Sequence, residues 1–255
     1  MNWEWIQKFN QLIMLAQEKL SKKQFILLSS ILVGLSAGIA AITLKSFVHL
    51  IFTLATYKPI VSIRYLYLVL PAFGIFLTVW AVKKILKGKL EKGLPPIHYA
   101  IAKKSSIVPR EQMYAQVLTS SLTVGLGGSA GLEAPIVITG AAFGSNYAKT
   151  YKLDYKDRTL LLACGVAAGI GAAFNAPIAG VLFALEVLLL DIGISAFTPL
   201  IIAAATGALI SKIFLQEDIL FTFPQSSEFN YLNVPFYVLL GVLTGLLAVY
   251  HQRMF

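Results

Sequence analysis

The sequence predicts an all-α, polytopic membrane protein with re-entrant and broken helices. The chain is 57% hydrophobic and only 13% charged, whereas a soluble domain carries about 25% charged residues. Apolar runs at 25–42 and 65–82 reach the ~18 residues that a membrane-spanning helix needs. Glycine and proline interrupt the apolar sequence at 93–95 and 131–135. Non-helical backbone at membrane depth is tolerated only where it lines a cavity or is buried in protein.

Each element follows from this pattern. Charges recur throughout residues 1–23, with no compact apolar core before a cleavage site, so we expect an amphipathic, partly interfacial helix there rather than a secretory signal. A transmembrane domain is expected over 24–255. Its paired prolines predict a short re-entrant helix at 95–104. The other expected helices are 24–57, 65–87, 110–125, 135–151, 158–173, 177–191, 197–214 and one from 234 onward, with external connections at 56–64 and 215–233.

The formal net charge of +9 is concentrated in the N-terminal segment, in 83–110 and in 149–158. Basic loops beside membrane spans usually face the cytoplasm. We therefore expect a multi-pass protein of a bacterial-type plasma (inner) membrane, in contact with membrane lipid, with its N-terminus in the cytoplasm. The acidic loop with Glu217, Asp218 and Glu228 would then lie outside. This distribution argues against nucleic acid as a partner.

Few residues suggest a metal or a cofactor. The single Cys164 excludes an internal disulfide, and the three histidines are dispersed without a Cys/His cluster. The stretch "GLGGSA" at 125–130 satisfies a dinucleotide-binding pattern, but that pattern needs a soluble βαβ unit. We therefore expect neither a metal nor a cofactor.

The stretch "GLGGSAGLEAP" at 125–135 places one carboxylate, Glu133, among glycines in an apolar region. A helix that begins at Pro135 would present unpaired N–H groups and a partial positive charge, which bind an anion. The glycines permit close approach of the main chain. An ionised Glu133 would occupy the anion site itself, and protonation would release it. Glu133 is therefore a candidate pH-sensitive gate or proton carrier. Gly165, Gly169 and Gly171 fit helix packing better.

These residues resemble the chloride channel and transporter (CLC) family. "GLEAP" at 131–135 is similar to the family's GREGP or GKEGP motif, whose glutamate is the external gate. "AAFNAPIAGVLFALE" at 172–186 resembles a family signature, and "KGLPPI" at 92–97 resembles the GSGIP motif. The three motifs occur in the family's order.

The resemblance implies an inverted-repeat fold, of which this chain would cover the first half only, and a homodimer with one pore per subunit. It implies transport of chloride or a similar small anion along a pathway lined by helix N-termini. Glu133 would be the gate, and Glu186 the candidate for a proton pathway. The implied anion-binding residues are Lys92, Gly93, Leu94, Gly131, Leu132, Ala134, Pro135 and Ile136.

Two departures from the family pattern bear on mechanism. Lys92 stands where GSGIP has a serine that coordinates the anion, so it either alters anion preference or extends to the cytoplasmic side. Val187 stands where family transporters often have a second acid that relays protons. This favours a passive channel, with a proton-coupled anion exchanger as the alternative. An intramembrane enzyme that uses Ser46 and His49, at i and i+3, is the alternative from another class; no third orienting group is evident, so we expect no enzymatic activity.

Overall fold

The computed structural model describes residues 3–56, 66–188, 196–215 and 231–254, and within these ranges it is helical with no strand. The expected turn at 56–64 and most of the loop at 215–233, with its three acidic residues, lie outside the described residues. The elements are α1 (Trp3–Lys19), α2 (Lys22–Ala55), α4 (Leu66–Lys84), α5 (Pro95–Lys103), α6 (Gln112–Gly125), α7 (Glu133–Thr150), α8 (Tyr155–Phe174), α9 (Pro177–Leu188), α10 (Phe197–Leu215), the 3-10 turn η2 (Tyr231–Asn233) and α11 (Val234–Met254).

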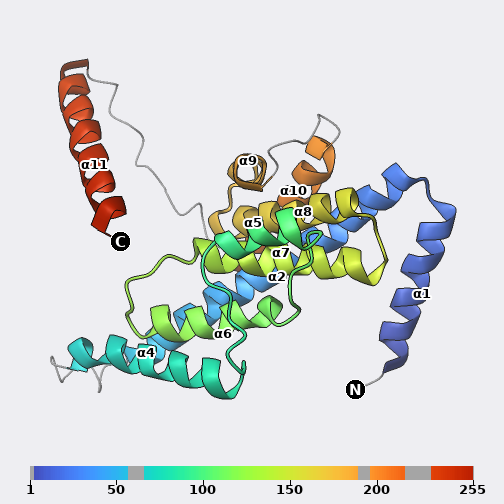
Figure 1. Cartoon of the computed structure of the whole chain (residues 1–255), viewed down its shortest axis with the longest axis horizontal. Helices are drawn as coiled ribbons and strands as arrows, with labels where there is room; N and C mark the ends of the chain where they lie inside the picture. The colour runs from blue at the N-terminus through green and yellow to red at the C-terminus, as the bar shows by residue number, and fades with distance from the viewer. Residues whose placement is uncertain (1–2, 57–65, 189–195, 216–230, 255) are drawn as a thin grey trace. The chain divides into compact units, whose positions relative to one another are not determined.

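The chain forms two compact units, Met1–Leu220 and Phe221–Phe255. In the first unit, α8 is the central helix, and α2, α7, α9 and α10 pack around it (Figure 1). Every residue from 161 to 173 of α8 is buried. The second unit consists of η2 and α11 in the part that is described.

Small residues allow the central helices to approach closely. A Cβ atom on Gly140 of α7 or on Gly165 of α8 would collide with the other residue's backbone carbonyl. A Cβ atom on Gly169 would lie 3.0 Å from Ile136 Cγ2, and one on Gly171 would lie 2.9 Å from Ala204 O. The packing role expected for the glycines of α8 is therefore confirmed.

Helix α7 begins two residues earlier than the sequence predicted. We expected Pro135 to start this helix, but its first residue is Glu133. Proline lacks only an N–H group, and the first turn of a helix has no intrahelical acceptor for that group. Pro135 is therefore accommodated inside the first turn, and the prediction of its position was wrong. Glu133 lies in this turn rather than before it.

Four helical segments in the described ranges are long and apolar enough to span a membrane: Lys22–Ala55, Tyr155–Phe174, Phe197–Leu215 and Tyr231–Met254. The second of these is surrounded by other helices, since 78% of its most apolar window is buried. Helix α5 has only 9 residues, which is too short to cross a bilayer.

Parts of the three basic segments contact one another in the first unit. Lys22 Nζ lies 2.8 Å from Asp154 Oδ2 and 2.9 Å from Asp157 Oδ2, which joins the start of α2 to the start of α8. Tyr155 Oη donates to the carbonyl of Ile101 at 3.1 Å, and Arg158 Nη1 donates to that of Ser105 at 3.0 Å. These contacts join 149–158 to both of the other segments.

Candidate functional site

The start of α7 presents free backbone donors. Leu132 precedes the helix and has no side-chain hydrogen bond to the first turn. Pro135 has no N–H group, and Ile136 N donates to Leu132 O at 3.1 Å. Within the described ranges, no hydrogen bond is formed by the amides of Glu133 and Ala134. These two amides, together with the positive end of the helix, can hold an anion.

The glycines before this helix differ in what they do. Gly125 packs against Ile51, whose Cβ would lie 2.7 Å from an added Cβ, and Gly127 adopts a φ of +91°. Gly131 has ordinary backbone geometry, is exposed, and has no described atom within 4 Å of the Cβ position. The need for close packing therefore explains why position 125 is a glycine, and the positive φ angle explains why position 127 is one. The space beside Gly131 leaves the main chain accessible to a ligand next to Glu133, which is itself exposed.

A cavity of about 740 Å³ adjoins this helix start. Leu132 lines it, together with Lys45, Ser46 and His49 of α2 and Leu215 of α10. Lys45 places a basic side chain at this cavity, and positive charge in a cleft attracts an anion. Lys45 was not among the site residues predicted from the sequence, although it is an isolated charge within the long apolar helix α2.

The start of α5 offers fewer donors than the sequence suggested. Gly93 takes a φ of +68°, which turns the chain into the helix. Pro95 and Pro96 have no N–H group, and Ile97 N donates to Leu94 O at 2.9 Å. Only the amides of Gly93 and Leu94 remain in this turn, and Lys92 is exposed beside them.

Glu91 is a further group at this site that the sequence analysis did not identify. Gln116 Nε2 donates to its carbonyl oxygen at 2.6 Å, and its own amide donates to Gln112 Oε1 at 3.4 Å. Its Oε2 atom is buried without a hydrogen-bond partner among the described residues. Burial raises the pKa of this carboxyl, and Lys104 opposes the shift. The only indication of Glu91 in the sequence was its position as an acidic residue directly before the candidate site residue Lys92.

The end of α9 lies against α5. The Nε2 atom of His98 lies 2.8 Å from the carbonyl oxygen of Val187. A carbonyl oxygen can only accept, so Nε2 carries the hydrogen. Glu186 is exposed at the same helix end. The structure thus brings His98 of α5 next to Val187 at the end of α9.

The two helix starts share a core rather than a direct bond. Leu94 and Leu132 both pack against the same apolar cluster of the first unit. No hydrogen bond joins the starts of α5 and α7 within the described ranges. The described residues also contain no group of three His, Cys, Asp or Glu side chains that could hold a metal ion.

Comparison with known proteins agrees with this architecture. The family pattern described as Voltage gated chloride channel matches residues 73–255. A ClcB-like chloride channel protein of Ralstonia nicotianae is 30% identical over 183 residues, which is 70% of this chain and 43% of that protein. The H(+)/Cl(-) exchange transporter ClcA of Vibrio cholerae is 27% identical over 233 residues, or 88% of this chain and 50% of the transporter.

Solved structures show the same fold. A slow cyanobacterial Cl-/H+ antiporter matches with a TM-score of 0.77 and 21% identity, over 92% of this chain and 57% of the antiporter. A CLC-type fluoride/proton antiporter matches with a TM-score of 0.71 and 24% identity, over 88% of this chain and 55% of that protein. The chain spans about half the length of the curated relatives that it matches. The match over 73–255, on a multi-pass helical membrane fold, establishes that the chain belongs to the voltage-gated chloride channel family.

Proposed function

We propose that the protein moves chloride or a similar small anion across a membrane, and that Glu133 gates the pathway at the start of α7. The observation that carries this proposal is the uncapped first turn of α7, with free amides at Glu133 and Ala134. An anion held by such amides is stabilised without a full countercharge. It can therefore leave as readily as it arrives, which conduction requires.

The remaining residues have roles that follow from their positions. Gly131, Leu132, Pro135 and Ile136 shape the α7 site, and the cavity with Lys45 and His49 gives access to it. Lys92, Gly93 and Leu94 form a second contact for the anion at the start of α5. The three basic segments of the first unit are cytoplasmic, with the N-terminus on that side of a bacterial-type inner membrane. A homodimer is the assembly that the family resemblance implies.

Proton-coupled exchange is the second candidate. The Vibrio cholerae relative is named as a H(+)/Cl(-) exchange transporter. Valine at the relay position 187 favours a channel, but Glu186 and His98 are protonatable groups at the same helix end. The enzyme reading of Ser46 and His49 has no support from the family, whose named relatives are channels and transporters.

Flux measurements separate these functions. The purified protein would be reconstituted into liposomes loaded with chloride, and release of chloride and uptake of protons would be recorded together. Chloride release without stoichiometric proton movement identifies a channel, and release with it identifies an exchanger. Loading with fluoride in a parallel arm tests the choice of anion. Absence of release for both anions would contradict the proposal.

A further inference from the structure

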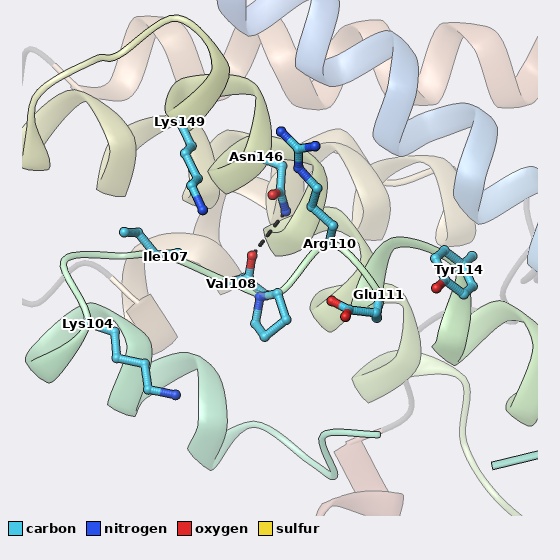
Figure 2. Close-up of a pocket in the computed structure, with 9 residues that line it drawn as sticks. Lys104, Ile107, Val108, Arg110, Glu111, Tyr114, Asn146 and Lys149 are labelled. Carbon is cyan, nitrogen blue, oxygen red and sulfur yellow. Dashed lines mark hydrogen bonds between the residues drawn. The ribbon is translucent and has the colours of Figure 1, made fainter. Parts of the chain in front are cut away.

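A basic cavity lies away from the candidate gate, between the segment that follows α5 and the end of α7. It has a volume of about 530 Å³ and is lined by residues of the 104–114 segment together with Asn146 and Lys149 (Figure 2). Figure 2 shows Lys104, Arg110 and Lys149 on three separate parts of its rim. All three side chains are exposed.

The cavity has an excess of positive charge. Its one carboxylate, Glu111, accepts from Lys89 Nζ at 2.7 Å and is thereby neutralised. Lys104 Nζ lies 5.3 Å from the centre of the Tyr99 ring, a contact that leaves its charge in place. In the described ranges, neither Arg110 nor Lys149 forms an ion pair. A ligand with several negative oxygens would complement these three cations.

The wall of the cavity is fixed by buried hydrogen bonds. Asn146 is 6% exposed and donates to the carbonyls of Val108 at 3.1 Å and Ala142 at 2.8 Å. Ser145 Oγ donates to Ser106 O at 2.7 Å and accepts from Val108 N at 2.9 Å. These bonds hold the 106–110 segment against α7, so the cavity is formed before any ligand binds.

An apolar groove shares one lining residue, Tyr114, with the basic cavity. Tyr114 lines both openings, and the groove extends from it between α2 and α6 with a volume of about 790 Å³. Tyr114, Leu118 and Leu122 recur at every fourth residue along one face of α6. Ile39 and Phe47 of α2, with Phe143 of α7, form the facing wall. A tyrosine at the junction of a polar and an apolar region is typical of the membrane interface.

We propose that this composite site binds a phospholipid with an anionic headgroup. The phosphate-bearing headgroup lies among Lys104, Arg110 and Lys149, and one acyl chain lies in the groove along α6. Basic pockets between membrane helices on the cytoplasmic side bind such headgroups. Charge complementarity alone would also fit free phosphate, but only a lipid uses the apolar groove that begins at Tyr114. The proposal requires a membrane location and does not depend on anion transport.

The test compares lipids on the intact protein. Purified protein in detergent would be titrated with phosphatidylglycerol, phosphatidylcholine and inorganic phosphate, and bound lipid would be counted by native mass spectrometry. We expect saturable binding of phosphatidylglycerol only. Equal binding of phosphatidylcholine would overturn the proposal, as would binding of inorganic phosphate as strong as that of the anionic lipid. Failure of any lipid to bind, as when a second copy of the chain covers the groove, would overturn it too.

Variants locate the site. The double variant Arg110→Gln/Lys149→Gln should bind phosphatidylglycerol about 30-fold more weakly, since each basic residue near an anionic lipid contributes a factor of about five to the affinity. Lys156→Gln, a substitution of an exposed lysine in the same basic segment outside the cavity, is the matched control and should bind normally. Unchanged binding by the double variant would contradict the assignment.

A second measurement avoids substitutions altogether. A phosphatidylglycerol with a photoreactive acyl chain would be added to the unsubstituted protein, and the labelled peptides would be mapped. Labelling of α6 around Tyr114–Leu122 and of the facing part of α2 supports the proposal. Labelling spread evenly over the exposed apolar helices would overturn it.

Discussion

The imidazole Nε2 of His98 donates to the carbonyl oxygen of Val187 at 2.8 Å, which links α5 to the last turn of α9. The last carbonyls of a helix have no intrahelical donor, and a hydrogen-bonding cationic or polar side chain there is favourable. Position 187 has no acidic side chain, yet its backbone carbonyl accepts a hydrogen bond from a side chain of α5. The end of α9 is therefore attached to the segment that carries Lys92.

Removal of this bond should loosen the attachment of α5. We expect His98→Ala to lower the free energy of unfolding by about 1 kcal/mol, the usual contribution of one hydrogen bond. His98→Gln retains an N–H donor and should recover part of the loss. Thermal unfolding of the detergent-solubilised protein measures both variants. Equal stability of His98→Ala and the unsubstituted protein would show that the bond contributes nothing.

Asp154 should stabilise the start of α8 in two ways. It accepts from Asp157 N at 2.8 Å and pairs with Lys22. Asp154→Ala should cost about 1 kcal/mol through the lost cap, whereas Asp154→Asn keeps a capping oxygen and should cost less. The hydrogen bonds from Asp157 N and Lys22 lower the pKa of Asp154.

The pH dependence of that contribution has a definite sign. Because the folded pKa of Asp154 is lower than its unfolded value, the charge-linked stability is present above about pH 4 and is lost as the pH falls through the folded pKa. The difference in melting temperature between the unsubstituted protein and Asp154→Asn should therefore narrow in acid. A difference that widens below pH 4 would contradict the ion-pair assignment.

Glu91 should have the opposite effect on stability. Burial raises its folded pKa, so the folded state binds this proton more tightly than the unfolded state does. Its contribution is most favourable below the unfolded pKa and declines as the pH rises through the folded pKa. Glu91→Gln removes this decline. The melting temperature of the variant, measured relative to that of the unsubstituted protein, should therefore be higher at pH 7 than at pH 4. If the two proteins differ in melting temperature by the same amount at both pH values, the burial assigned to the Glu91 carboxyl would be contradicted.

Lys92 offers a test of selectivity. It is exposed at the start of α5, where few backbone donors remain. If it contacts the anion, Lys92→Ser should change the ratio of chloride to fluoride flux by about two- to fivefold, the effect of an exposed charge. Lys87→Ser, at an exposed lysine outside the candidate site, is the control. An unchanged ratio would favour the interpretation that Lys92 extends to the cytoplasmic side.

The sequence predicted the helices well because apolar runs and Gly/Pro breaks are local signals. The predicted re-entrant helix at 95–104 differs from α5 by one residue at its end. Pro135 led to a wrong helix start, because a proline is also tolerated later in the first turn, where its missing N–H group has no intrahelical acceptor. The packing role of Gly165 was also predicted, because small residues in an apolar helix allow a neighbouring helix to approach closely.

Parts of the candidate site depend on contacts that no sequence pattern carries. Glu91 is held by Gln112 and Gln116, and His98 contacts a residue 89 positions away. Lys45 and Leu132 line the same cavity because α2 passes close to the start of α7. Such relationships arise from tertiary packing. Local sequence patterns therefore predicted Glu133 as a candidate gate but did not predict the polar groups around the site.

The most direct test of the account is the response of Glu133→Gln to external pH. Chloride release from liposomes would be recorded at several external pH values for the unsubstituted protein and the variant. If the ionised carboxylate competes for the amides of α7, release by the unsubstituted protein rises as the external pH falls, by up to about tenfold per pH unit, the limit for one protonation. The variant should release chloride at a nearly constant rate across the same range. A variant that keeps the original pH response would contradict the assignment of Glu133 as the gate.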